Sequence, residues 1–148
     1  MKDSRKAILG VVLTAVVTIM LVAPGLQALP AVGGKFNLPF DVQWGGKMVL
    51  PTGDYKFSVD RLSSNGMISV YRDNQAVGMV LPEVFDSYEK QSKKPELVCV
   101  RHDGKVTVRA LRLPGIGTYY FQMPKDLQTL VAQQPKLIET VPVQVSGE

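Results

Sequence analysis

Apolar side chains occupy every second position in the segment 36–44, which is the pattern of a strand with one buried face. The apolar members are Phe36, Leu38, Phe40, Val42 and Trp44. Because successive side chains of a strand point to opposite faces, all five share one face, and we expect that face to lie in the core. Pro39 cannot donate a ladder hydrogen bond, so the strand lies at a sheet edge or breaks there.

Turn signals separate further short apolar or alternating segments along the chain. They stand at Gly45-Gly46, Pro51–Gly53, Asn65-Gly66, Asp73-Asn74 and Asp103-Gly104. Asn-Gly and Asp-Gly favour two-residue primed turns, so we expect the segments on either side of them to pair as hairpins. The further strands expected are 47–50, 55–60, 67–72, 76–81, 96–102, 105–113 and 118–122.

Seven or eight short strands at regular spacing predict an all-β fold, a small antiparallel β-sandwich or barrel. One short C-terminal helix is expected over 124–134, where Leu127, Leu130 and Val131 share a face that would cap the core. The last segment, 135–148, is either an edge strand or a mobile tail, and Pro142 weakens the strand interpretation.

The first 28 residues have the three-part order of an export signal. Three basic residues stand among the first six positions, an uncharged apolar run covers 7–23, and helix breakers follow at 24–25. Cleavage is expected after the small residue Ala28, which leaves a single β domain over 29–148. The run of 17 residues is also at the lower limit for crossing a bilayer. An uncleaved membrane anchor, with the domain held on the outer side of the inner membrane, is therefore the alternative.

Removing the signal halves the net charge of the chain. The full 148 residues carry 17 basic and 13 acidic groups, whereas 29–148 carry 14 and 12, a net charge of +2. The basic residues stand singly between acids and form no stripe that could follow a phosphate backbone, so nucleic acid is not an expected partner. The densest charge, in 89–94, is expected to be a solvated loop.

One cysteine and one histidine leave little metal or nucleophile chemistry to expect. Tetrahedral zinc needs about four such ligands, and a disulfide scaffold needs pairs, so no metal, cofactor or internal disulfide is predicted. Cys99 and His102 are three positions apart on one expected strand and should point to opposite faces. Cys99 is expected to be a buried, unpaired thiol, with an intermolecular disulfide as the alternative, and His102 a structural residue beside a turn.

Three further patterns match catalytic motifs only in part. Ser87–Lys90 reads S-x-x-K, but the S-D-N and K-T-G companions of that motif are missing from the sequence. Gly115–Thr118 lacks the third glycine of a dinucleotide loop and is expected to be a plain connection between strands. The acids that could serve a glycosidase show no paired spacing; they are Asp41, Asp54, Asp60 and Glu83. The sequence therefore assigns no catalytic residue.

Two places could support binding. The segment 82–95 is a long loop with Phe85 and Tyr88 among charged residues, and we expect it to be mobile rather than functional. In the aromatic run Tyr119–Phe121, alternation sends Tyr119 and Phe121 to one face and Tyr120 to the other, so at least one ring should reach solvent.

The motifs Phe36–Val42, F-x-x-P-F-x-V, and Leu50–Tyr55, L-P-x-G-x-Y, followed by Leu97-Val98 before a hairpin, resemble a group of short, exported, uncharacterised β-rich proteins of acidobacteria. The likeness covers most of 35–124. It departs at 106–108, where an aromatic pair is typical, and beyond 124. The resemblance implies export and a β fold, and it transfers no site residue.

The sequence thus favours an exported, non-catalytic β domain with a binding or structural role in the periplasm or at the cell surface. A membrane-tethered β module that keeps 7–23 as an anchor is the alternative, and a hydrolase of unknown substrate is the third hypothesis. The ligand, the partners and the oligomeric state are not determined by the sequence.

Overall fold

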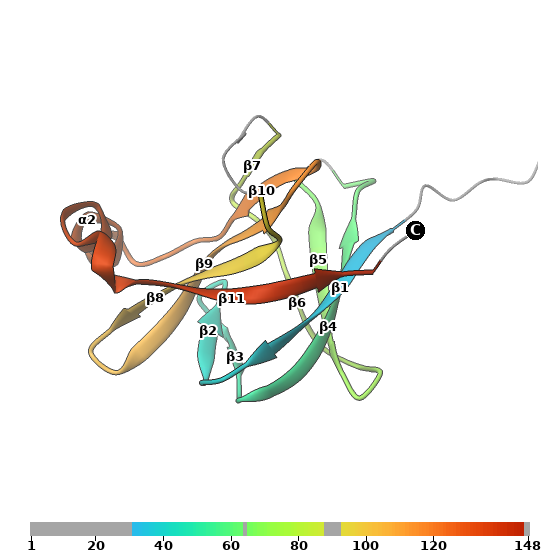
Figure 1. Ribbon diagram of the computed structural model, residues 1–148, viewed down its shortest axis with the longest axis horizontal. Coiled ribbons are helices and arrows are strands. Elements are labelled where there is room, and N and C mark those ends of the chain that lie inside the picture. The colour runs from blue at the N-terminus through green and yellow to red at the C-terminus, as the bar shows by residue number, and fades with distance from the viewer. Residues whose placement is uncertain (1–30, 64, 88–92, 147–148) are drawn as a thin grey trace, which may run out of the picture.

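The computed structural model describes residues 31–63, 65–87 and 93–146, and in this part of the chain 11 strands form one strongly curved sheet (Figure 1). The strands are β1 (Val32–Leu38), β2 (Val42–Trp44), β3 (Met48–Leu50), β4 (Gly53–Asp60), β5 (Met67–Arg72), β6 (Gln75–Val80), β7 (Val84–Asp86), β8 (Glu96–His102), β9 (Lys105–Leu113), β10 (Gly117–Tyr120) and β11 (Ile138–Val145). Helix α2 (Lys125–Gln133) and the 3-10 turn η2 (Pro135–Leu137) precede β11.

The sheet curls into a nearly closed barrel. Its strand order is β3-β2-β9-β8-β11-β1-β4-β5-β6, and β10 pairs with both β9 and β7. The pairings between described strands are antiparallel except the single contact of β2 with β9. Side chains cover the gap between the end strands, because Met48 lies against Gly78 of β6 and the Gly45 backbone lies against Val80.

The all-β prediction is confirmed, but the expected number of seven or eight strands is wrong. Pro39 breaks the segment 36–44 into β1 and β2, as one of the two interpretations of this proline required. Two further strands come from segments without a clear alternating pattern. The short β7 lies inside the expected loop 82–95, and β11 forms from the C-terminal tail.

The alternation of apolar and polar residues in the sequence predicted most of the buried core side chains. The inward side chains of β1, β2 and β4 are buried together, and Phe40 alone of the expected face is only half-buried. Trp44 packs edge-on against Phe36 and Phe121, with ring centroids 6.0 and 5.2 Å away. The buried members of β1, β2 and β4 are Phe36, Leu38, Val42, Trp44, Tyr55, Phe57 and Val59.

Strand β11 lies inside the sheet and is not the edge strand or mobile end that the tail was expected to be. Residues Ile138 to Pro142 pair with β8, and Gln144 and its neighbours pair with β1 (Figure 1). Pro142 pairs with Glu96 at the end of the β11–β8 ladder, and the β11–β1 ladder begins at the next residue. The N–H that proline lacks therefore interrupts neither ladder. Pro142 weakens the prediction of a strand, but its position between the two ladders makes it compatible with β11.

Of the two predicted two-residue hairpin turns, Asp103-Gly104 has the expected form and Asn65-Gly66 does not, while the predicted turn at Asp73-Asn74 also joins its strands through two residues. Asp73-Asn74 joins β5 to β6 with φ values of 50° and 63°, and Asp103-Gly104 joins β8 to β9 with 50° and 73°. The Asn65-Gly66 hairpin is correct in its strands but wrong in its turn. Asp60 pairs with Met67, so six residues separate the strands, and the Ser63 hydroxyl accepts a hydrogen bond from the Met67 N–H.

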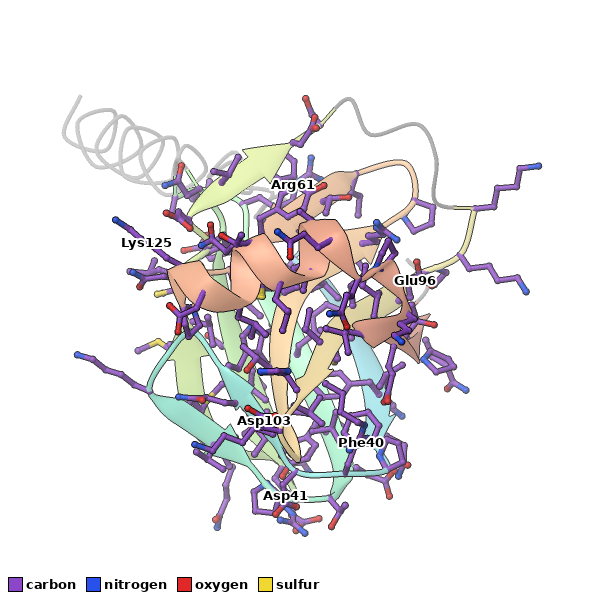
Figure 2. The ribbon with its side chains drawn as sticks, turned by 90° about the vertical axis from the view of Figure 1, so that its left-hand side faces the viewer. Phe40, Asp41, Arg61, Glu96, Asp103 and Lys125 are labelled. Carbon is purple, nitrogen blue, oxygen red and sulfur yellow. The ribbon has the colours of Figure 1, made fainter. Side chains whose placement is uncertain are left out.

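Helix α2 agrees with the predicted 124–134 but packs elsewhere than expected. Val131 and Met123 form a small cluster with Val100 on the outer face of β8, which is separate from the barrel core. Figure 2 shows the helix lying across the outside of the barrel, with Lys125 at its first turn. It covers one wall of the barrel rather than closing its end.

The expected signal, 1–28, lies outside the described residues. Among the residues that are described, no helix combines the length and apolar character needed to cross a membrane.

Candidate functional site

The two most reactive side chains lie in different environments. Cys99 is fully buried, and this burial raises the pKa of its thiol to about 12, with a further contribution from the Glu139 carboxylate and an opposing one from Arg101. His102 is exposed beside the β8–β9 turn, where its Nε2 is 3.1 Å from Oδ2 of Asp103. The expected placement on opposite faces is confirmed, and the two do not share a site.

Arg101 and Glu139 form a two-bond ion pair between β8 and β11. Arg101 Nε and the guanidinium nitrogen Nη2 donate to the two carboxylate oxygens of Glu139 over 2.6 and 3.1 Å. These hydrogen bonds lower the pKa of Glu139. The same guanidinium lies over the Phe40 ring at 4.7 Å, at the end of the molecule opposite Arg61 (Figure 2). Each partner of this group is engaged, so we assign it to stability.

The candidate glycosidase acids are used locally or are spread over the surface. Asp41 accepts a hydrogen bond from the Thr52 N–H, and Asp60 accepts one from the Leu62 N–H, so both stabilise turns. Asp54 accepts one from Asn37, and Glu83 is exposed. The described residues contain no group of three His, Cys, Asp or Glu side chains that could hold a metal ion.

The aromatic run follows the predicted alternation, with Tyr119 and Phe121 buried and Tyr120 half-buried. Phe85 of β7 stacks on Tyr119 with centroids 4.6 Å apart, so this part of the expected loop 82–95 is a packed strand. Tyr88 and the rest of the Ser87–Lys90 motif beyond its serine lie outside the described residues. In the segment Gly115–Thr118, the first two residues lie in the turn between β9 and β10 and the last two begin β10, so the segment is part of a plain connection between strands, as predicted.

A groove with a volume of about 710 Å³ crosses the outer face of the sheet. Its walls come from four neighbouring strands, β11, β1, β4 and β5, and from the Asp73-Asn74 turn. These strands lie side by side in Figure 1. The outward side chains that line it are Lys35, Asn37, Asp54, Lys56, Tyr71, Asp73, Asn74, Thr140, Pro142 and Gln144. They alternate with the core residues described above, so the polar half of the same strands builds the groove.

The ladder register arranges these side chains in two rows. In one row Lys35 stands directly opposite Lys56, with Gln144 beside Lys35 and Tyr71 beside Lys56. In the next row Asn37 stands opposite Asp54. Rows two residues apart along a strand are separated by about 7 Å. The groove therefore has a basic row and an acidic row.

Hydrogen bonds fix some of these groups and leave others open to a ligand. The Asn37 amide donates to Asp54 Oδ1 over 2.8 Å, and the Lys56 ammonium donates to Asn74 Oδ1 over 2.7 Å. The Lys35 ammonium has no hydrogen-bond or ion-pair partner among the described residues. The groove is thus partly organised before any ligand arrives, and within the described part of the chain the Lys35 ammonium stays unpaired.

The sequence pattern did not predict this groove. Alternation identifies Lys35, Asn37, Asp54 and Lys56 as outward residues, but the partner of each depends on strand register. Lys35 and Lys56 meet only because β1 pairs with β4 across the β2–β3 hairpin. The sequence shows which side chains lie on the polar face of each strand. It does not show the sheet topology that brings these faces together.

Comparison with known proteins gives no relative from which to transfer a site: no family model, curated protein or solved structure matches the chain.

Proposed function

We propose that the chain is an exported, non-catalytic β-barrel domain that binds a ligand in the groove over β11, β1, β4 and β5. The observation that carries the proposal is the groove itself, where one face of the sheet gathers ammonium, carboxylate, amide and phenol groups over about 710 Å³. This volume lies within the range of about 300–1,000 Å³ that is typical of small-molecule sites.

The positions of the reactive residues support a binding role over catalysis. A nucleophile needs a base within hydrogen-bond reach, and its thiolate must form near neutral pH. Cys99 is buried with a pKa of about 12, and His102 is exposed at a turn beside Asp103. Neither side chain lines the groove.

The proposed compartment is the periplasm or the cell surface, and it rests on the export signal in 1–28. The membrane-tethered alternative keeps 7–23 as an anchor and leaves the groove unchanged. Both forms place the same sheet face outside the cytosol.

Thermal shift measurements test the binding proposal. The probes are neutral and acidic oligosaccharides, short peptides and phosphorylated metabolites, added to protein purified after expression of the full chain. A ligand at 100 times its Kd stabilises the folded state by about 2.7 kcal/mol, which raises the Tm by several degrees. We expect at least one probe class to do this in the wild type.

The double variant Asn37→Ala/Tyr71→Ala alters two strands of the groove and should lose the shift. Lys105→Ala, on the exposed β8–β9 hairpin, is the matched control and should keep it. The proposal fails if no probe raises the Tm, or if the double variant responds as the wild type does. Turnover of a hydrolase substrate that is lost in His102→Ala would favour the enzyme hypothesis instead.

A further inference from the structure

Two lysines face each other across the middle of the groove. Lys35 of β1 and Lys56 of β4 are directly opposite in the antiparallel ladder, which places their Cβ atoms about 5 Å apart. Like charges in this position destabilise a sheet. Lys56 is held by Asn74, whereas Lys35 has no partner among the described residues. The described part of the chain therefore keeps two like charges opposite each other and pairs only one of them, and an anion between them would relieve the repulsion.

The rest of the groove supplies groups of a different kind. Asp54 and Asp73 can only accept hydrogen bonds once ionised, while the amides of Asn37, Asn74 and Gln144 can both donate and accept. A ligand that contacts the basic row and the acidic row together must carry an anionic acceptor at one place and donors about 7 Å away. Hydroxyl groups next to a carboxylate meet this requirement, and the half-exposed Tyr71 ring adds an apolar face.

Most main-chain groups of the groove strands are engaged in the sheet. Strand β4 pairs with β1 and β5, and β5 pairs with β4 and β6. Strand β11 pairs with β8 from Ile138 to Pro142 and with β1 from Val143 to Val145, so most ladder groups of the groove strands are already used. Recognition of a peptide by strand addition needs an exposed edge. A ligand in this groove is therefore contacted mainly by side chains, which favours a molecule with polar groups around its periphery.

We propose that the groove binds an acidic saccharide, with the sugar carboxylate between the Lys35 and Lys56 ammonium groups and the sugar hydroxyls over Asn37 and Asp54. This inference rests on the proposed function and narrows it to a ligand class.

Isothermal titration calorimetry with oligogalacturonate tests the proposal, and its methyl ester is the matched neutral probe. The protein is that obtained by expressing the full chain. We expect the acid to bind more tightly than the ester, by about tenfold or more, because the ester removes a charge-assisted hydrogen bond. Lys35→Gln should weaken binding of the acid by a similar factor and leave the ester unchanged, while Lys35→Arg keeps most of the affinity.

Lys105→Gln removes one positive charge away from the groove and is the control for general attraction. Unchanged melting temperatures show that each variant is folded. If acid and ester bind equally, and both lose binding in Asn37→Ala/Tyr71→Ala, the ligand is not an acidic saccharide. The proposal that the groove binds a ligand is then still supported. If neither the acid nor the ester binds, the acidic saccharide proposal is overturned. If no probe class of the thermal shift measurements binds either, the binding function is overturned as well. Equal losses in Lys35→Gln and Lys105→Gln, or equal affinity for oligoglutamate, would also overturn the proposal.

Discussion

The single cysteine shows how burial, as the largest of several effects, can decide the chemistry of a residue. Cys99 contacts the barrel core, and a pKa of about 12 against an ordinary 9.0 lowers its thiolate fraction at pH 8 by about 1,000-fold. We expect thiol reagents to label it only after unfolding in urea. Labelling of the folded protein, or a disulfide-linked dimer on a non-reducing gel, would contradict this placement.

The ion pair of Arg101 with Glu139 should make stability depend on pH. Its hydrogen bonds lower the folded-state pKa of Glu139 below the unfolded 4.5. The contribution to stability is therefore complete above pH 4.5 and is lost as the pH falls through the lowered folded-state pKa. Glu139→Gln should have a lower Tm than the wild type at neutral pH, and the difference should vanish in strong acid.

Glu83→Gln is the control for this measurement, because Glu83 is exposed and has no side-chain partner among the described residues. A difference between Glu139→Gln and the wild type that persists in strong acid would show that the carboxylate acts through packing and not through its charge.

At the scale of elements, the close approach of β1, β4 and β11 depends on a residue without a side chain. A Cβ at Gly34 would lie 2.6 Å from the Gln144 carbonyl oxygen and 2.7 Å from the Phe57 ring. Gly34→Ala should therefore lower the free energy of unfolding by about 1–3 kcal/mol, measured by urea denaturation.

Gly104→Asn is the contrasting variant. Gly104 has a φ of 73° and nothing within 4 Å of a Cβ, and asparagine tolerates this conformation, so the cost should stay below about 1 kcal/mol. Equal losses in the two variants would mean that β1 and β11 are not packed as closely as described.

The elements also show where sequence reasoning works and where it stops. Strict alternation identified the core face of β1 and β4, and Asp103-Gly104 marked a true two-residue hairpin. The interior place of β11 was missed because Pro142 looks unfavourable until the exchange of partners at that residue is known. The groove was missed for the same reason, since no local pattern brings Lys35 opposite Lys56.

At the scale of the whole molecule, the export hypothesis makes a separate prediction. If 1–28 is a cleaved signal, protein recovered from cells should begin at Leu29. N-terminal sequencing checks this directly. An intact N-terminus on protein recovered with the membrane fraction would favour the tethered alternative, in which the same barrel is held beside the bilayer.

We propose that the protein binds its ligand through the outer face of β11, β1, β4 and β5. A ¹⁵N NMR titration with oligogalacturonate measures this residue by residue. We expect shift changes centred on Lys35, Asn37, Lys56 and Tyr71, with the α2 helix and the β8–β9 hairpin unchanged. Shift changes centred on those other elements, or none at saturating ligand, would contradict it.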